Sequence, residues 1–143
     1  MQRLLHEQVY LDTNIFIALI EAFNAKAIDL FRAAEQGLIY LVTSEVTRGE
    51  VLLKPMQNEN MDLVARYQEL FDNTNGLTPL AADGVVMREA ATFAATSGLE
   101  LIDAVHCATA EAADCAFVIS QDKDMRHYSP IDVLSLDELE ALA

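Results

Sequence analysis

The chain has 143 residues, and 52% of them are apolar, which is enough for one continuous hydrophobic core. This length predicts a single domain over residues 1–143, and no Pro-, Gly- or Ser-rich run marks a linker. The 23 acidic and nine basic residues give a net charge of -14. Such a charge argues against a nucleic-acid-binding protein, because sequence-independent affinity for phosphates comes from Lys and Arg.

Neither a membrane anchor nor a secretory leader is expected. The apolar stretch Val9–Ile20 is interrupted by an Asp-Thr-Asn triplet, well short of the ~20 apolar residues that a spanning helix needs. No basic segment with a small-residue cleavage site precedes it. Cys107 and Cys115 do not form a CxxC pair, and their apolar neighbours indicate buried thiols in a reducing compartment. We therefore expect a soluble cytoplasmic protein.

Hydrophobic periodicity in the first half of the chain predicts strands that alternate with helices. The helix that begins at Glu45 is expected to end at Leu53, because Pro55 disfavours the α conformation in Lys54. In chain order, the expected elements are a strand at 9–11, helices at 15–21 and 25–36, a strand at 38–42, and helices at 45–53 and 61–71.

The second half continues the same alternation. The expected elements are a strand at 76–80, helices at 85–96 and 101–113, strands at 115–119 and 131–134, and a terminal helix at 136–142. This order predicts an α/β fold, a three-layer α/β/α sandwich around a central, mostly parallel sheet of about five strands. Ligands of such sheets bind beyond the carboxyl ends of the strands.

Four acidic residues lie at the predicted carboxyl edge of the sheet or on helices of the predicted fold. Asp12 ends the first strand, and Asp122 follows the strand that ends at Ile119. Glu50 lies on the helix after the second strand, and Asp103 lies in the first turn of an apolar helix whose neighbours predict burial. Taken singly, Asp12 is a preferred helix cap, Glu50 is typical of a solvated helix face, and Asp103 favours the helix macrodipole.

Taken together, these acids predict a site for a hard cation. A cluster of oxygen ligands with no nearby Cys or His pair is what Mg²⁺ or Mn²⁺ requires, and it is a poor fit to zinc. Without a cation, carboxylates in one pocket repel one another and raise their pKa values.

Four sequence segments with the appropriate order and spacing resemble PIN domains, including the VapC-like ribonuclease toxins of prokaryotic toxin–antitoxin pairs. They are VYLDTNIFI at 9–17, TSEVTRGEVLLKP at 43–55, LIDAVHCATA at 101–110 and FVISQDKDM at 117–125. The resemblance covers nearly the whole chain. It implies a metal-dependent endoribonuclease in which Asp12, Glu50, Asp103 and Asp122 hold Mg²⁺ or Mn²⁺ and RNA phosphodiester bonds are hydrolysed.

The same resemblance assigns supporting roles. Asp124 is a further candidate for the metal site, and Asn14 orients a carboxylate or water. Thr13 and Ser120 are equally consistent with hydrogen bonds to the acids and with plain caps or turns. The residues expected to contact RNA phosphates, with solvated surface charge as the alternative for each, are Arg48, Lys54, Lys123 and Arg126.

The resemblance also implies partners: an RNA substrate, a cognate antitoxin whose basic segment masks the acidic pocket, and a second copy of the chain in a homodimer. Two alternatives remain open. One is a non-catalytic PIN-like scaffold or binding module, which the charge of -14 favours. The other is a different acidic-pocket phosphoester hydrolase, although Asn14 stands where a phosphatase places its second Asp.

His106 receives no role from the sequence. It follows Asp103 by three residues, a spacing seen in di-iron helical bundles, but a single such pair in a chain with several strands argues against that class.

Overall fold

The computed structural model describes residues 1–139. Within them, a single sheet has the strand order β3-β2-β1-β4-β5, and every neighbouring pair is parallel. The strands are β1 (Gln8–Leu11), β2 (Tyr40–Ser44), β3 (Leu77–Leu80), β4 (Phe117–Ile119) and β5 (Val133–Leu134). The predicted central sheet of about five strands is confirmed.

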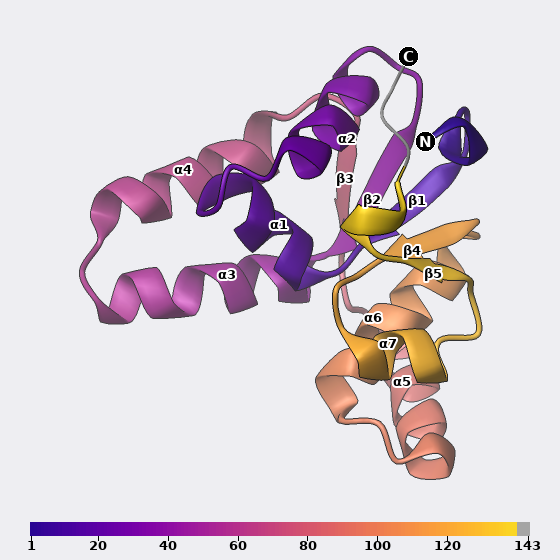
Figure 1. Cartoon of the computed structure of the whole chain (residues 1–143). Helices are drawn as coiled ribbons and strands as arrows, with labels where there is room; N and C mark the ends of the chain where they lie inside the picture. Colours follow the sequence, from indigo (N-terminus) through magenta and orange to yellow (C-terminus); the bar gives the residue numbers. More distant parts are fainter. Residues whose placement is uncertain (140–143) are drawn as a thin grey trace.

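Helices cover both faces of this sheet, which confirms the α/β/α sandwich (Figure 1). One side carries α1 (Thr13–Ile20), α2 (Ala25–Glu35), α3 (Glu45–Gln57) and α4 (Met61–Asn73), and the other carries α5 (Gly84–Ser97), α6 (Leu101–Ala112) and α7 (Lys123–Tyr128). Short 3₁₀ helices lie at Gln2–Leu4 and Leu136–Glu138. Among residues 1–139, no helix is long and apolar enough to cross a membrane.

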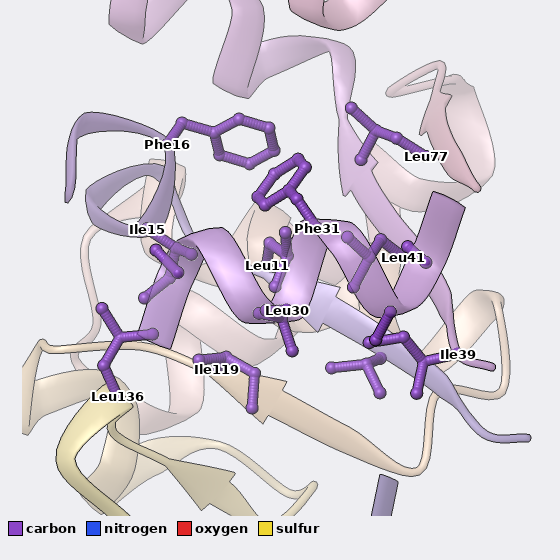
Figure 2. Packing of buried hydrophobic residues seen from close by; sticks show 14 of the residues in the cluster. Leu11, Ile15, Phe16, Leu30, Phe31, Ile39, Leu41, Leu77, Ile119 and Leu136 are labelled. Carbon is purple, nitrogen blue, oxygen red and sulfur yellow. The ribbon is translucent and has the colours of Figure 1, made fainter. Parts of the chain in front are cut away.

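The strands alternate their side chains between the two layers, as the pleat requires. Figure 2 shows the core on the α1–α2 side, where strand residues such as Leu11, Leu41 and Ile119 meet Phe16 and Leu30. The intervening strand residues point to the opposite layer and pack with both cysteines of α6 and its following turn. Cys107 and Cys115 are buried free thiols, as expected.

The prediction that α3 ends at Leu53 is wrong, because the helix continues to Gln57 with Pro55 inside it. A proline removes one backbone N–H, and here the loss falls near the end of the helix. Pro55 is buried, and the N–H of Asn58 closes the last turn on the carbonyl of Lys54 at 3.0 Å. Packing of this turn therefore outweighs the single missing hydrogen bond.

The end of the chain also differs from the prediction. The sequence did not indicate α7, whose six residues begin at the Asp122 cap and are too few to show a helical period. The predicted helix at 136–142 is wrong in its described part, which is one 3₁₀ turn closed by a capping box between Ser135 and Glu138. The backbone is extended at Leu139, and residues 140–142 of that prediction lie outside the described residues.

Candidate active site

The site begins where the central strands end. The backbone N–H of Asp12, directly after β1, donates to the carbonyl of Ile119 at the end of β4, at 3.1 Å. This bond extends the ladder between the two strands by one residue and fixes the Asp12 backbone at the carboxyl edge of the sheet. Its side chain is buried there, with 4% of the residue exposed.

Both carboxylate oxygens of Asp12 have donors. Oδ1 accepts from the backbone N–H of Thr13 at 2.8 Å, so Asp12 is the cap of α1. Oδ2 accepts from the Ser120 hydroxyl at 2.6 Å and from the Asn14 amide at 3.3 Å. The Ser120 oxygen in turn accepts from the backbone N–H of Asp122 at 3.0 Å. Asn14 and Ser120 thus hold Asp12 in place and link it to the start of α7.

Glu50 and His106 form a second network next to Asp12. Oε1 of Glu50 accepts from the Thr13 hydroxyl at 2.6 Å and pairs with Nε2 of His106 at 2.8 Å. The imidazole is 1% exposed, and its Nδ1 lies 2.6 Å from the Tyr10 hydroxyl. Nε2 also lies 3.8 Å from Oδ1 of Asp12. His106 was missed from the sequence, although a polar side chain on the buried face of α6 needs a partner.

The pKa values of this pair shift in opposite directions. Burial raises the pKa of Glu50, but hydrogen bonds from His106 and Thr13 outweigh it and hold the pKa below its ordinary value. Burial lowers the pKa of His106, but the hydrogen bond to Glu50 and the charge of Asp12 outweigh it and raise the pKa. Both shifts favour an imidazolium–carboxylate pair.

The other acids border a separate pocket of about 460 Å³. Burial, together with the charges of Asp12 and Asp122, raises the pKa of Asp103 to about 6. The predicted burial of Asp103 is met only in part: the residue is half-buried, because its neighbours Leu101 and Ile102 are 45% and 42% exposed. The residues that line this pocket are Gly98, Leu99, Glu100, Asp103, Asp122, Asp124 and Tyr128.

The predicted acids are therefore linked by contacts and charge, but their side chains do not converge on a single metal position. Asp12 is the shared neighbour: it contacts the Glu50 network through His106 and acts electrostatically on Asp103. Glu50 lines a different pocket, of about 290 Å³. Across residues 1–139, no three His, Cys, Asp or Glu side chains form a ready-made metal-binding group.

The four basic candidates for RNA contact divide into two kinds. Arg48 joins α3 to α4: its guanidinium pairs with Glu45 at 2.7 Å and Asp72 at 2.8 Å. Arg126 is paired with Glu138, the last residue of the 3₁₀ helix Leu136–Glu138. Lys54 and Lys123 are exposed, the first in the pocket that Glu50 lines and the second beside Asp122 at the start of α7.

Asp103→Asn is expected to stabilise the chain at pH 7.5. The pKa of Asp103 lies near 6 in the folded chain and at 3.8 in the unfolded chain. The folded chain therefore becomes less stable as pH rises through this window, because folding disfavours the charged carboxylate. Because Asp103 is half-exposed, solvent screening reduces the gain to about 1 kcal/mol, or a rise in Tm of about 3 °C. Calorimetry of both proteins at pH 7.5 and pH 4 checks this prediction, since the difference in Tm between variant and wild type should vanish at pH 4. A variant Tm equal to or below that of the wild type at pH 7.5 would contradict it.

Comparison with known proteins identifies the family and the fold of the chain. Residues 9–129 match the family model described as PIN domain. No curated protein sequence matches the chain significantly.

Three solved structures illustrate the shared fold. VapBC2 from Rickettsia felis, bound to a promoter DNA fragment, is 12% identical with a TM-score of 0.71, covering 90% of this chain and 98% of its own. A toxin–antitoxin complex from Klebsiella pneumoniae is 19% identical with a TM-score of 0.70, covering 92% and 99%. VapC20 from Mycobacterium tuberculosis, a sarcin–ricin loop cleaving toxin, is 14% identical with a TM-score of 0.67, covering 83% and 93%. At these identities the likeness shows the fold.

Proposed function

Since the chain belongs to the PIN-domain family, we propose that it is a metal-dependent endoribonuclease that acts in the cytoplasm as the toxin of a type II toxin–antitoxin pair. The observation that carries the proposal is the electrostatic coupling at the sheet edge. Burial, followed by the charges of Asp12 and Asp122, raises the pKa of Asp103 to about 6, even though the charge of His106 acts in the opposite direction. Acids arranged in this way favour a bound cation.

The donor set fits Mg²⁺ or Mn²⁺, because it consists of carboxylates flanked by hydroxyl and amide oxygens. Asp12, Glu50, Asp103 and Asp122 would hold the cation, with Asp124 at the rim. When bound, the cation supplies Lewis-acid chemistry that stabilises negative charge on the scissile phosphate. Since no three of these side chains form a ready-made group, binding requires side-chain rotation, for which the half-buried Asp103 and Asp122 have room.

The surrounding residues have separate tasks in this proposal. Ser120 and Asn14 keep the Asp12 carboxylate at the edge of the sheet. The exposed Lys54 and Lys123 lie next to the acids and meet RNA phosphates, whereas the paired guanidiniums of Arg48 and Arg126 mainly join elements of the fold. With a net charge of -14, binding of RNA depends on these few cations and on the metal.

The proposal includes two protein partners. A cognate antitoxin with a basic segment complements the acidic pocket and the charge of the whole chain. A homodimer is supported by exposed apolar side chains on α5 and α6, namely Val85, Leu101 and Ile102.

A non-catalytic scaffold is the second candidate. Two observations favour it: the strongly acidic chain, and the absence of a ready-made group of metal ligands within residues 1–139. It differs from the nuclease in one testable respect, because a scaffold that has lost the site would neither bind Mn²⁺ nor cut RNA.

Incubating the wild-type chain with a panel of structured and single-stranded RNAs in Mg²⁺, Mn²⁺ or EDTA tests the proposal. We expect cleavage products in either metal and none in EDTA, read by gel electrophoresis of end-labelled RNA. Cutting that persists in EDTA would contradict metal dependence. If Mn²⁺ binds but no RNA is cut, a different phosphoester substrate replaces RNA, and if neither occurs the scaffold is supported.

A further inference from the structure

His106 lies beneath the acidic site without being one of its predicted ligands. It is 1% exposed, so it cannot contact RNA directly. Both of its ring nitrogens have partners, the Tyr10 hydroxyl at 2.6 Å and Oε1 of Glu50 at 2.8 Å. A buried ring held at both nitrogens has one orientation.

The same hydrogen bonds determine the orientation of Glu50. This side chain is about a third exposed on α3, where a glutamate ordinarily samples several rotamers. His106 and Thr13 converge on its Oε1, at 2.8 Å and 2.6 Å. Because both take the same oxygen, Oε2 is left for a ligand.

The position of the imidazole also fixes which acid Glu50 faces. Nε2 of His106 lies 3.8 Å from Oδ1 of Asp12, and the hydroxyl of Thr13, the residue next to Asp12, lies 3.4 Å from the same nitrogen. The chain Tyr10–His106–Glu50 therefore links the buried underside of β1, through α6, to a carboxylate on α3. Within residues 1–139, the hydrogen bond that joins Glu50 to α6 is the one with His106.

We propose that His106 is a positioning residue: held by Tyr10, it keeps the Glu50 carboxylate beside Asp12 with one oxygen free for the cation. The inference rests on the proposed ribonuclease for its kinetic readout, and it has a second readout in Mn²⁺ affinity. Partners that orient metal-ligating side chains commonly contribute ~10- to 100-fold to affinity or activity.

The test compares His106→Leu with His106→Gln in the full chain. The glutamine amide can donate to Glu50 from nearly the position of Nε2, whereas leucine cannot donate at all. We expect His106→Leu to lower kcat ~10- to 100-fold and to weaken Mn²⁺ binding about tenfold, measured by electron paramagnetic resonance of the free ion. KM for RNA should stay within about threefold because the buried ring does not touch the substrate, and His106→Gln should recover most of both losses.

Two further variants separate positioning from stability. His106→Leu removes one partner of the buried Tyr10 hydroxyl, which also hydrogen-bonds with Thr43 and Thr47, and the loss of a buried hydrogen bond is costly. Tyr10→Phe/His106→Leu replaces both members of the Tyr10–His106 pair by apolar side chains. The double variant should regain Tm but remain as inactive as His106→Leu. As a control, Asn24→Ala removes the side-chain cap of α2, which accepts from the backbone N–H groups of Lys26 and Ala27 at 3.0 Å and 3.1 Å; it should lower Tm but leave kcat and Mn²⁺ affinity unchanged.

The outcomes distinguish this inference from the proposed function. A folded His106→Leu protein with wild-type kcat and Mn²⁺ affinity would overturn the positioning role while the ribonuclease stands. A double variant that regains activity along with Tm would also overturn it, since the loss would then be one of stability. If the wild type cuts no RNA yet His106→Leu weakens Mn²⁺ binding and His106→Gln restores it, the positioning role stands and the ribonuclease does not.

Discussion

Asp12→Asn is expected to reduce RNA cleavage by ~100-fold or more, because a site built on metal-assisted charge stabilisation supplies several kcal/mol of the rate enhancement. Asp12 is the acid that both networks share, through Ser120 on one side and His106 on the other. Asparagine has nearly the same volume and can still cap α1 through its carbonyl oxygen, so the fold should persist. The measurement is kcat with Mg²⁺, alongside thermal unfolding.

Asp83→Asn is the matched control for this variant. Asp83 caps α5 as Asp12 caps α1, accepting from the backbone N–H of Val86 at 3.0 Å, and it is not among the residues that contact Asp12. We expect it to change Tm no more than Asp12→Asn does and to leave kcat intact. Cleavage by Asp12→Asn at the wild-type rate would remove Asp12 from the catalytic site.

Gly76→Ala should produce the largest loss of stability from a single added methyl group. Gly76 has a φ of +83°, and a Cβ there would lie 2.4 Å from the backbone carbonyl oxygen of Ala34 in α2. The left-handed conformation costs an L-alanine ~1 to 2 kcal/mol, and the forced shift of backbone adds ~1 to 3 kcal/mol. At about 3 °C per kcal/mol, Tm should fall by about 10 °C.

Gly37→Ala separates the two contributions. Gly37 has a similar φ of +77°, but nothing lies within 4 Å of an added Cβ. Gly37→Ala should therefore lower the free energy of unfolding only by the cost of the left-handed conformation, about 1 to 2 kcal/mol, when both variants are unfolded by heat in the same buffer. Equal losses in the two variants would show that the close approach to α2 contributes nothing.

The fold could be predicted from the sequence because its signals are local and repeated. Apolar runs such as Val9–Leu11 and the alternation of strand with helix sufficed to predict a parallel sheet between two helical layers. The errors arose where tertiary packing overrides local preference. Pro55 is buried within α3 instead of ending it, and α7 is too short to show a period.

The sequence predicted where two of the candidate acids lie on the sheet, and it did not predict the hydrogen bonds that connect the candidate acids to other side chains. The positions of Asp12 and Asp122 after two predicted strands indicated that both lie at the carboxyl edge of the sheet. No spacing rule predicts that Glu50 is held by a histidine 56 residues away. The sequence of α6 places His106 among buried apolar residues without naming the partner that burial demands. Likewise, the sequence did not predict the ion pairs of Arg48 and Arg126, because their acidic partners lie on other turns or elements.

Calorimetric titration of the wild-type chain with Mn²⁺ tests most directly whether the acids at the sheet edge bind a divalent cation. Binding at this edge is expected, with the affinity reduced at least about tenfold in Asp12→Asn. Absence of binding at millimolar Mn²⁺, or equal affinity in the folded Asp12→Asn protein, would contradict the account.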